Sequence, residues 1–317
     1  MSFTSQIKVE LAKAEPRRLC CLRAQCYGAW LFSKCFGLQE GTYITETPAA
    51  ARRMLELAAA GAGVAAQMRY AVSRRNRPAC RVSLPEEQDR RQLLEAFGHT
   101  GQEPCLRINR AVLEDECCPE AFLRGAFLTC GSATDPNKSY HLEFAVPHKN
   151  LAWDLYTLLG EAGGLGVAPA VVRRAGSWGV YLKDSGQIED LLTYMGAAGA
   201  SMELMQVKMY KEAKNNINRK SNFETANMDK TYSASARQTA AIAAINDSRG
   251  LESLPENLRE LARLRLDNPE MTLRELSGRL GVSRSGVNHR LQRLLEIGEA
   301  LLEEKGVEEL TQAPIQK

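Results

Sequence analysis

A run of nineteen residues near the C-terminal end of the chain, Ser277 to Leu295, contains no aspartate or glutamate. Arginine, asparagine, serine and histidine recur there at spacings that would place them on one exposed face of a helix. Such side chains suit the major groove of DNA, because arginine pairs with guanine O6 and N7, and asparagine pairs with adenine N6 and N7. The alternative is a solvated basic face in an ordinary helix bundle. The candidate DNA-contacting residues of this helix are Arg284, Ser285, Asn288, His289, Arg290 and Arg293.

Local capping signals indicate the helices that would position this face. The segment Thr272–Glu275 has the form of a capping box, in which each end residue bonds the free backbone N–H of the other. A helix is therefore predicted to start there and to run to Leu280. Gly281 supplies a tight turn, and Ser283 can cap a further helix that continues to about Ile297.

Apolar spacing indicates how these helices pack. Two amphipathic helices are expected before the pair, at residues 238–247 and 255–267. The pair itself has apolar residues at the positions that lock the two helices of a helix-turn-helix together. These residues are Leu276, Leu280, Val282, Val287 and Leu291. The sequence therefore predicts an all-α helix-turn-helix domain at residues 238–303, followed by a disordered tail at residues 304–317.

The preceding segment, residues 206–237, is unusually polar. Residues 208–237 contain seven basic residues, three acidic residues and five asparagines. Asn215, Asn218 and Asn222 would share one face of a helix, although asparagine disfavours helix interiors. Two interpretations stay open: contact with nucleic acid or another domain, and a plain linker. The candidate DNA-contacting residues here are Arg219, Lys220, Asn222 and Lys230.

An internal duplication precedes this segment. Residues 20–33 recur 97 residues later as residues 117–130, with six identical positions. Chance agreement between two apolar helices is the alternative. Each copy is helical in pattern, and the Gly-Ala pair at its centre would let the two helices approach closely. Strands are predicted at residues 41–45, 68–72, 80–84, 140–146, 170–174 and 179–183, and further helices at residues 48–60, 149–161 and 185–195. We therefore expect an α+β domain of two pseudo-symmetric αββ-type halves, residues 1–110 and 111–205.

A duplicated helix with a central glycine, followed by strands, resembles the LAGLIDADG homing-endonuclease fold. The order of segments is similar to the WhiA family of bacterial regulators, from about residue 5 to about residue 303, and the run from Asn218 to Thr231 looks like the signature that opens the C-terminal domain of that family. The resemblance implies a sequence-specific DNA-binding transcription regulator linked to cell division, chromosome segregation or sporulation. It also implies double-stranded DNA as the partner and a cytoplasmic, nucleoid-associated location.

The positions of the nuclease acids carry other residue types. Active LAGLIDADG nucleases hold divalent cations with an acidic residue near the end of each repeated helix. Laying the motif on this sequence puts the second position at Cys130, and the 97-residue offset puts the first at Ser33. Magnesium prefers hard, charged oxygen ligands, so we expect no catalytic residue and no enzyme activity. Two alternatives stay open: an endonuclease with a metal site displaced to Asp135 and Glu40, and an interaction protein of the division machinery that binds another protein through the N-terminal domain.

Composition limits the remaining classes of function. The net charge of +3 is too small to name a partner. No apolar run is long enough for a membrane span or a signal peptide, so a cytosolic chain without a membrane partner is expected. The nine cysteines form no C-x-x-C pair, and no histidine completes a zinc-knuckle spacing. We expect reduced thiols that pack as small apolar groups, with no metal or cofactor.

The basic stretch Arg69–Arg81, which includes Arg74 and Arg75, suits either phosphate contacts or a solvated hairpin turn.

Overall fold

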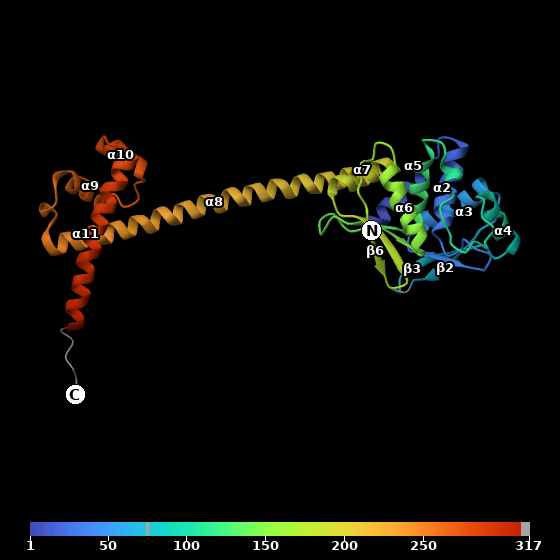
Figure 1. Cartoon of the computed structure of the whole chain (residues 1–317), viewed down its shortest axis with the longest axis horizontal. Helices are drawn as coiled ribbons and strands as arrows, with labels where there is room; N and C mark the ends of the chain where they lie inside the picture. The colour runs from blue at the N-terminus through green and yellow to red at the C-terminus, as the bar shows by residue number, and fades with distance from the viewer. Residues whose placement is uncertain (74–75, 312–317) are drawn as a thin grey trace, which may run out of the picture. The chain divides into compact units, whose positions relative to one another are not determined.

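The computed structural model describes residues 1–73 and 76–311. The chain divides into two compact units, Met1–Glu212 and Ala213–Lys317 (Figure 1). No helix of the described residues is long and apolar enough to cross a membrane.

The first half of the N-terminal unit alternates helices and strands. In chain order the elements are α1 (Phe3–Lys13), α2 (Leu19–Leu31), β1 (Thr42–Thr45), α3 (Pro48–Ala62), β2 (Gln67–Val72), β3 (Pro78–Ser83) and α4 (Glu87–Ala96). The strands form an antiparallel sheet in the order β1-β3-β2. Pro48 suits the first turn of α3, where a backbone N–H would have no partner within the helix.

The second half has a similar order, with two strands where the first half has β1 alone. Its elements are a 3-10 turn (Arg110–Leu113), α5 (Cys118–Cys130), β4 (Gly131–Ala133), β5 (Leu142–Val146), α6 (Lys149–Glu161), β6 (Ala170–Arg174), β7 (Ser177–Leu182) and α7 (Ser185–Met195). The sheet is antiparallel in the order β4-β5-β7-β6. Both halves thus have the predicted order of helix, strands and helix, and the predicted α+β fold class is confirmed.

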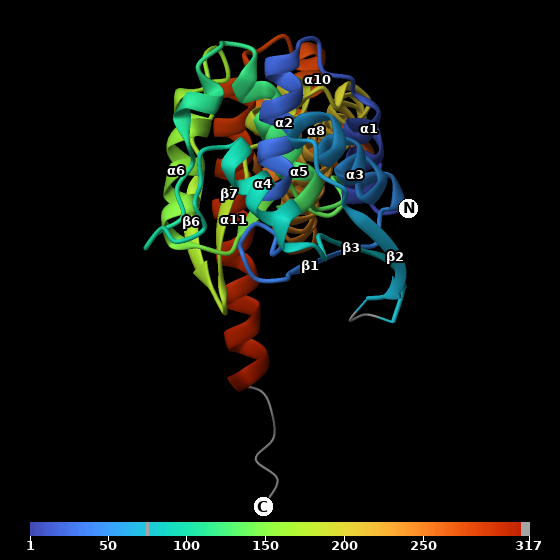
Figure 2. The ribbon, with the colours of Figure 1, turned by 90° about the vertical axis from the view of Figure 1, so that its right-hand side faces the viewer.

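The repeated helices α2 and α5 pack against each other at the centre of the unit, with β1–β3 to one side and β6 and β7 to the other (Figure 2). A Cβ atom on Gly28 would lie 2.1 Å from the Phe122 carbonyl oxygen, and one on Gly125 would lie 2.1 Å from the Gln25 carbonyl oxygen. The two contacts are related by the 97-residue offset of the duplication. The helix axes can approach this closely only because both central residues lack side chains.

Helix α8 (Ala198–Arg249) is one continuous helix of 52 residues, and the division between the units falls inside it. A polar connecting segment at residues 206–237 and a separate helix at residues 238–247 were expected from the sequence. The structure joins both into α8. The reason is that no glycine or proline occurs between Ala200 and Arg249, and asparagine weakens a helix much less than either of those residues. Gly250, at φ 71°, ends the helix.

The C-terminal unit packs the end of α8 against a small helical bundle. After a 3-10 turn (Leu251–Ser253) come α9 (Glu256–Asp267), α10 (Leu273–Leu280) and α11 (Arg284–Thr311). Its buried core includes Ile242 from α8, Leu261 from α9, Leu276 from α10 and Val287 from α11. The predicted α9 region and the helix-turn-helix pair therefore share one core with α8.

Helix α11 continues beyond its expected end near Ile297 and beyond residue 303, the expected end of the domain. Gly298 does not stop it. A Cβ atom there would lie 2.4 Å from the Ala241 carbonyl oxygen, so this glycine allows α11 to lie closely against α8. The tail expected at residues 304–317 is therefore helical as far as Thr311, and residues 312–317 lie outside the described part of the chain.

Candidate nucleic-acid interface

The turn between α10 and α11 has the caps that the sequence predicts. The Thr272 hydroxyl accepts a hydrogen bond from the Glu275 backbone N–H at 3.3 Å, and a Glu275 carboxylate oxygen accepts one from the Thr272 N–H at 2.8 Å. This backbone hydrogen bond lowers the pKa of Glu275. Gly281 adopts the left-handed conformation at φ 61°, and Ser283 Oγ accepts from the Gly286 N–H at 3.1 Å. The turn therefore holds α11 at a defined angle to α10.

The predicted apolar positions hold the helix pair together. Leu276, Val287 and Leu291 are fully buried, and Leu280 and Val282 are half-buried against the same core. Burial of these side chains fixes which face of α11 is turned away from the bundle. That outward face is the one that carries the candidate DNA contacts.

The side chains of that face are exposed and mostly free. Exposed positions are Arg284, Ser285, Asn288, His289, Gln292 and Arg293, whereas Arg290 is half-buried. Within the described residues, no hydrogen bond or ion pair engages the side chains of Arg284, Asn288 or His289. Arg293 forms an ion pair with Glu296 at 2.9 Å. Arg284 and Asn288 lie four residues apart, about one helical turn, so both can reach the same partner surface.

The second candidate group lies on α8, where Arg219, Lys220, Asn222 and Lys230 are all exposed. Lys230 follows Arg219 by eleven residues, so the two share a face about three turns apart, whereas Lys220 points about 100° away from Arg219. Met228 and Tyr232 of α8 line a pocket with Pro269 and Glu270 of the bundle, so Lys230 lies beside the bundle, whereas Arg219 lies about 14 Å before Met228 along the helix. Arg219, Lys220 and Asn222 thus lie on a stretch of α8 that precedes the contact with the bundle.

Ser33 and Cys130, the two positions aligned with nuclease acids, line one pocket of about 590 Å³ at the ends of α2 and α5. The Ser33 hydroxyl donates to the Trp30 carbonyl oxygen at 2.7 Å. The Cys130 thiol donates to the Ala126 carbonyl oxygen at 3.3 Å, and burial raises its pKa to about 12. Neither position offers an anionic oxygen at neutral pH.

Three acids are candidates for a displaced metal site, and two of them have other partners. Asp135 is exposed and accepts hydrogen bonds from the backbone and side-chain nitrogens of Asn137, at 2.9 and 3.0 Å, which lower its pKa. Glu40 is exposed. Glu46 lines the pocket and pairs with Arg77 at 3.5 Å. The described part of this pocket therefore does not bring two carboxylates together.

The basic stretch Arg69–Arg81 lies on the β2–β3 hairpin. Arg69 pairs in register with Arg81 across the two strands, and both side chains are exposed. Arg74 and Arg75 lie outside the described residues. Two arginines thus project from one face of the sheet, an arrangement that fits either of the two interpretations of this stretch.

Comparisons with known proteins decide the family. The WhiA C-terminal HTH domain matches residues 217–298, and the WhiA LAGLIDADG-like domain matches residues 119–214. A protein of Alkaliphilus metalliredigens named "Probable cell division protein WhiA" is 36% identical over 94% of this chain and 98% of its own length. The chain belongs to the WhiA family. A WhiA relative of the same name from Heliobacterium modesticaldum is 38% identical over 97% of this chain and 99% of its own length.

The solved structures agree on the fold. Full-length DUF199/WhiA from Thermatoga maritima matches 95% of this chain and 99% of that chain, with a TM-score of 0.58 and 24% sequence identity. Membership of the WhiA family confirms the predicted resemblance, with a LAGLIDADG-like domain followed by a C-terminal helix-turn-helix domain.

Two features of this WhiA-family chain were not predicted from its sequence. Glu46, at the edge of the Ser33/Cys130 pocket, follows a strand and has no motif to mark it. Cys20 meets Cys117 and Cys118 in one cluster, although 97 residues separate it from Cys117 in the sequence. The duplicated Cys-Cys pair was the available signal, because a close pseudo-twofold helix pair brings equivalent positions together.

Proposed function

We propose that this protein is a sequence-specific DNA-binding regulator of transcription, acting in cell division, chromosome segregation or sporulation. The observation that carries the proposal is the exposed face of α11 between Arg284 and Leu295, which contains no acidic residue, on a helix-turn-helix whose opposite face is buried. Such a face presents donors and acceptors that can reach base edges in the major groove. The partner would be double-stranded DNA, and the location cytoplasmic and nucleoid-associated.

The α11 residues divide into two roles. Arg284 and Asn288 are free and one turn apart, so we assign them to base edges. Ser285 and His289 beside them suit either a base edge or a phosphate. Arg290 is half-buried and Arg293 is paired with Glu296, so phosphate contacts suit both.

We assign the α8 group to phosphate contacts. Arg219, Lys220, Asn222 and Lys230 are all exposed on the surface of α8. The three charged side chains, Arg219, Lys220 and Lys230, would neutralise phosphates and release counterions, which gives affinity that depends on salt and little on sequence. The neutral Asn222 amide can donate a hydrogen bond to a phosphate oxygen.

The N-terminal unit acts without catalysis in this proposal. A hydroxyl and a protonated thiol stand where a LAGLIDADG nuclease would need two carboxylates, and they donate to carbonyl oxygens of α2 and α5 respectively. The unit would instead contact DNA non-specifically or bind another protein.

Genome-wide mapping of bound sites tests the proposal directly. A strain carrying the wild-type protein should show a limited set of enriched promoter sites with a shared sequence. The Arg284→Ala/Asn288→Ala double variant, at equal protein abundance, should lose that enrichment, while the Arg91→Ala variant on α4 should keep it. An absence of enriched sites with the wild-type protein would favour an interaction protein of the division machinery.

A further inference from the structure

The N-terminal ends of the repeated helices bring cysteines from both halves of the duplication together. Cys20 lies in the first turn of α2, Cys117 is the N-cap of α5, and Cys118 is its first residue. The three sulfur atoms all lie within 4.8 Å of one another. Cys21 is adjacent, with its thiol 3.7 Å from the Cys117 carbonyl oxygen.

The separation of the sulfurs suits a metal ion better than a disulfide. The Sγ atoms of Cys20 and Cys117 are 3.7 Å apart. A tetrahedron of thiolates around zinc, with Zn–S bonds of about 2.3 Å, has edges of about 3.8 Å. A disulfide would need the two sulfurs to approach to about 2.05 Å. The first arrangement can form with little movement of α2 or α5.

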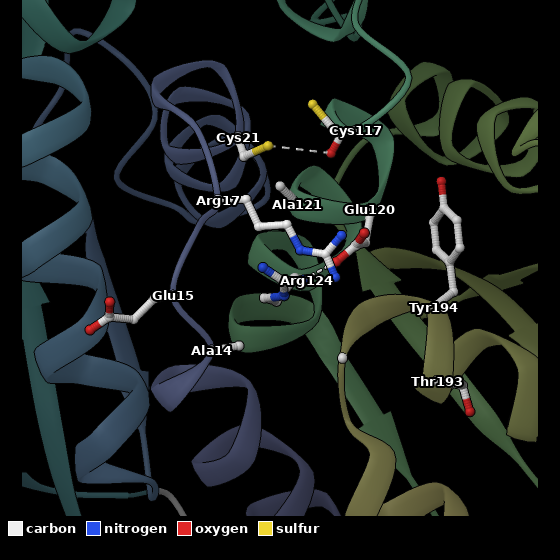
Figure 3. A pocket seen from close by; sticks show the side chains of 11 residues that line it. Ala14, Glu15, Arg17, Cys21, Cys117, Glu120, Ala121, Arg124, Thr193 and Tyr194 are labelled. Atoms are coloured by element: carbon white, nitrogen blue, oxygen red, sulfur yellow. Dashed lines mark hydrogen bonds and ion pairs between the residues drawn. The ribbon is translucent and has the colours of Figure 1, made fainter.

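The position of the cluster in the fold favours negative charge on the sulfurs. The cluster lies at two helix N-termini, where unpaired backbone N–H groups and the helix dipole stabilise negative charge. Figure 3 shows a pocket of about 400 Å³ that is lined by Cys21 and Cys117 and also by Arg17 and Arg124, whose guanidinium groups lie near Glu120. Arg124 is already engaged by Glu120 and by the Met195 carbonyl oxygen, whereas Arg17 is exposed. The pocket also gives an ion a path from solvent to the sulfurs.

We propose that Cys20, Cys117 and Cys118 hold a structural zinc ion, with Cys21 as the fourth ligand. The site joins α2 of the first half to α5 of the second half, at the end of the helix pair opposite to Ser33 and Cys130. Zinc bound there adds its binding free energy to the stability of the N-terminal unit.

The thiols differ in how readily they give up a proton. Burial raises the pKa of Cys21 to about 11 and that of Cys118 to about 12, whereas a hydrogen bond from Cys21 lowers the pKa of Cys117. Each coordinating thiol releases its proton to solvent as the ion binds, so zinc affinity rises with pH.

Metal analysis and alkylation test the site on the full-length wild-type protein. After purification under reducing conditions, stripping with a chelator and dialysis against zinc, we expect about one zinc ion per chain by elemental analysis. Bound zinc should protect Cys20 and Cys117, the two half-buried thiols of the site, from iodoacetamide, read by peptide mass spectrometry. The exposed thiol of Cys105 should be labelled equally with and without zinc.

Variants locate the ion. Cys117→Ser should weaken zinc binding at least about tenfold and abolish the zinc-dependent rise in thermal midpoint, whereas Cys105→Ser should behave as the wild type. The alkylation pattern keeps the test valid if Cys117→Ser fails to fold. Zinc bound without protection of these thiols would overturn the proposal. So would a chain that binds no zinc, including one in which Cys20 and Cys117 are found as a disulfide.

Discussion

The α2/α5 pair and the α10/α11 pair differ in how their helices pack and in where their polar side chains lie. In the α2/α5 pair the two backbones are in close contact, since neither Gly28 nor Gly125 has space for a Cβ atom. The polar side chains at the C-terminal ends of these helices, Ser33 and Cys130, are neutral and donate to carbonyl oxygens of α2 and α5. In α10/α11 apolar side chains hold the pair, and the polar face is exposed. A fold can thus be preserved by its packing after its catalytic positions have changed, whereas a binding function depends on what the surface presents.

The largest expected effect is on the α2/α5 packing. Gly28→Val or Gly125→Val should destabilise the N-terminal unit by about 3 kcal/mol or more, because the new side chain would overlap a backbone carbonyl that cannot move aside. All three tryptophans, Trp30, Trp153 and Trp178, lie in this unit, so urea unfolding followed by tryptophan fluorescence reports on it alone.

Gly160→Ala is the matched control for that experiment. Gly160 lies in α6, and no atom lies within 4 Å of the position its Cβ would take. The substitution should leave stability unchanged or raise it by up to about 1 kcal/mol, through the higher helix propensity of alanine. Equal stability of the Gly28 variant and this control would mean that the helices are not closely packed.

The next effect concerns the α11 face. Arg284→Ala or Asn288→Ala should cost about 1–3 kcal/mol of binding to a mapped site while leaving affinity for a scrambled duplex nearly unchanged, because the shortened side chain cannot form a bidentate pair with a base. Neither residue belongs to the buried core, so circular dichroism should show an intact fold. Titration of both duplexes at one stated salt concentration measures the difference. Equal weakening on both would assign these residues to phosphates, and no weakening would move recognition away from α11.

The C-terminal helix pair could be predicted closely because its signals are local. The Thr272–Glu275 capping box, Gly281 and Ser283 each act within a few residues of their partners, and the structure has all three in the expected roles. The ends of the longer helices could not be predicted in the same way. Gly298 has the usual residue type of a helix end, yet it packs against Ala241, which lies 57 residues away in the sequence.

Long-range placement accounts for the remaining differences. The polar residues between 206 and 237 continue α8 because no glycine or proline there ends the helix. The asparagine content of this segment alone does not distinguish a continuous helix from an irregular linker. The thiol cluster and Glu46 depend on how distant segments meet, and cysteine spacing along the chain does not record this. The close packing of the two repeated helices was predictable. Equivalent positions of the two helices then lie close together, which is why Cys20 and Cys117 meet.

A smaller effect is expected on α8. Arg219→Ala with Lys220→Ala should weaken binding to all duplexes similarly, and should reduce the slope of log affinity against log salt by about 1 for each phosphate that the variant no longer neutralises. Arg91→Ala, which removes an exposed arginine paired with Glu87 on α4, is the control and should change neither. Fluorescence anisotropy at several salt concentrations gives both quantities. An unchanged slope in the double variant would mean that Arg219 and Lys220 do not contact phosphates and that this part of α8 only connects the two units.

The last comparison is at the Ser33/Cys130 pocket, where no effect is expected. With magnesium or manganese, the protein should not nick or cleave supercoiled plasmid above background, because the Ser33 hydroxyl is neutral and the Cys130 thiol, with a pKa of about 12, stays protonated at neutral pH. Tyr43, which also lines this pocket, supplies no anionic oxygen either, because its hydroxyl donates a hydrogen bond to the Leu128 carbonyl oxygen at 2.9 Å. The assay measures conversion of supercoiled to open-circular plasmid over time, with a heat-denatured sample and a chelator as blanks. Metal-dependent nicking that Asp135→Ala or Glu46→Ala abolished would show that a displaced carboxylate site had replaced the original one, and the N-terminal unit would then be an enzyme.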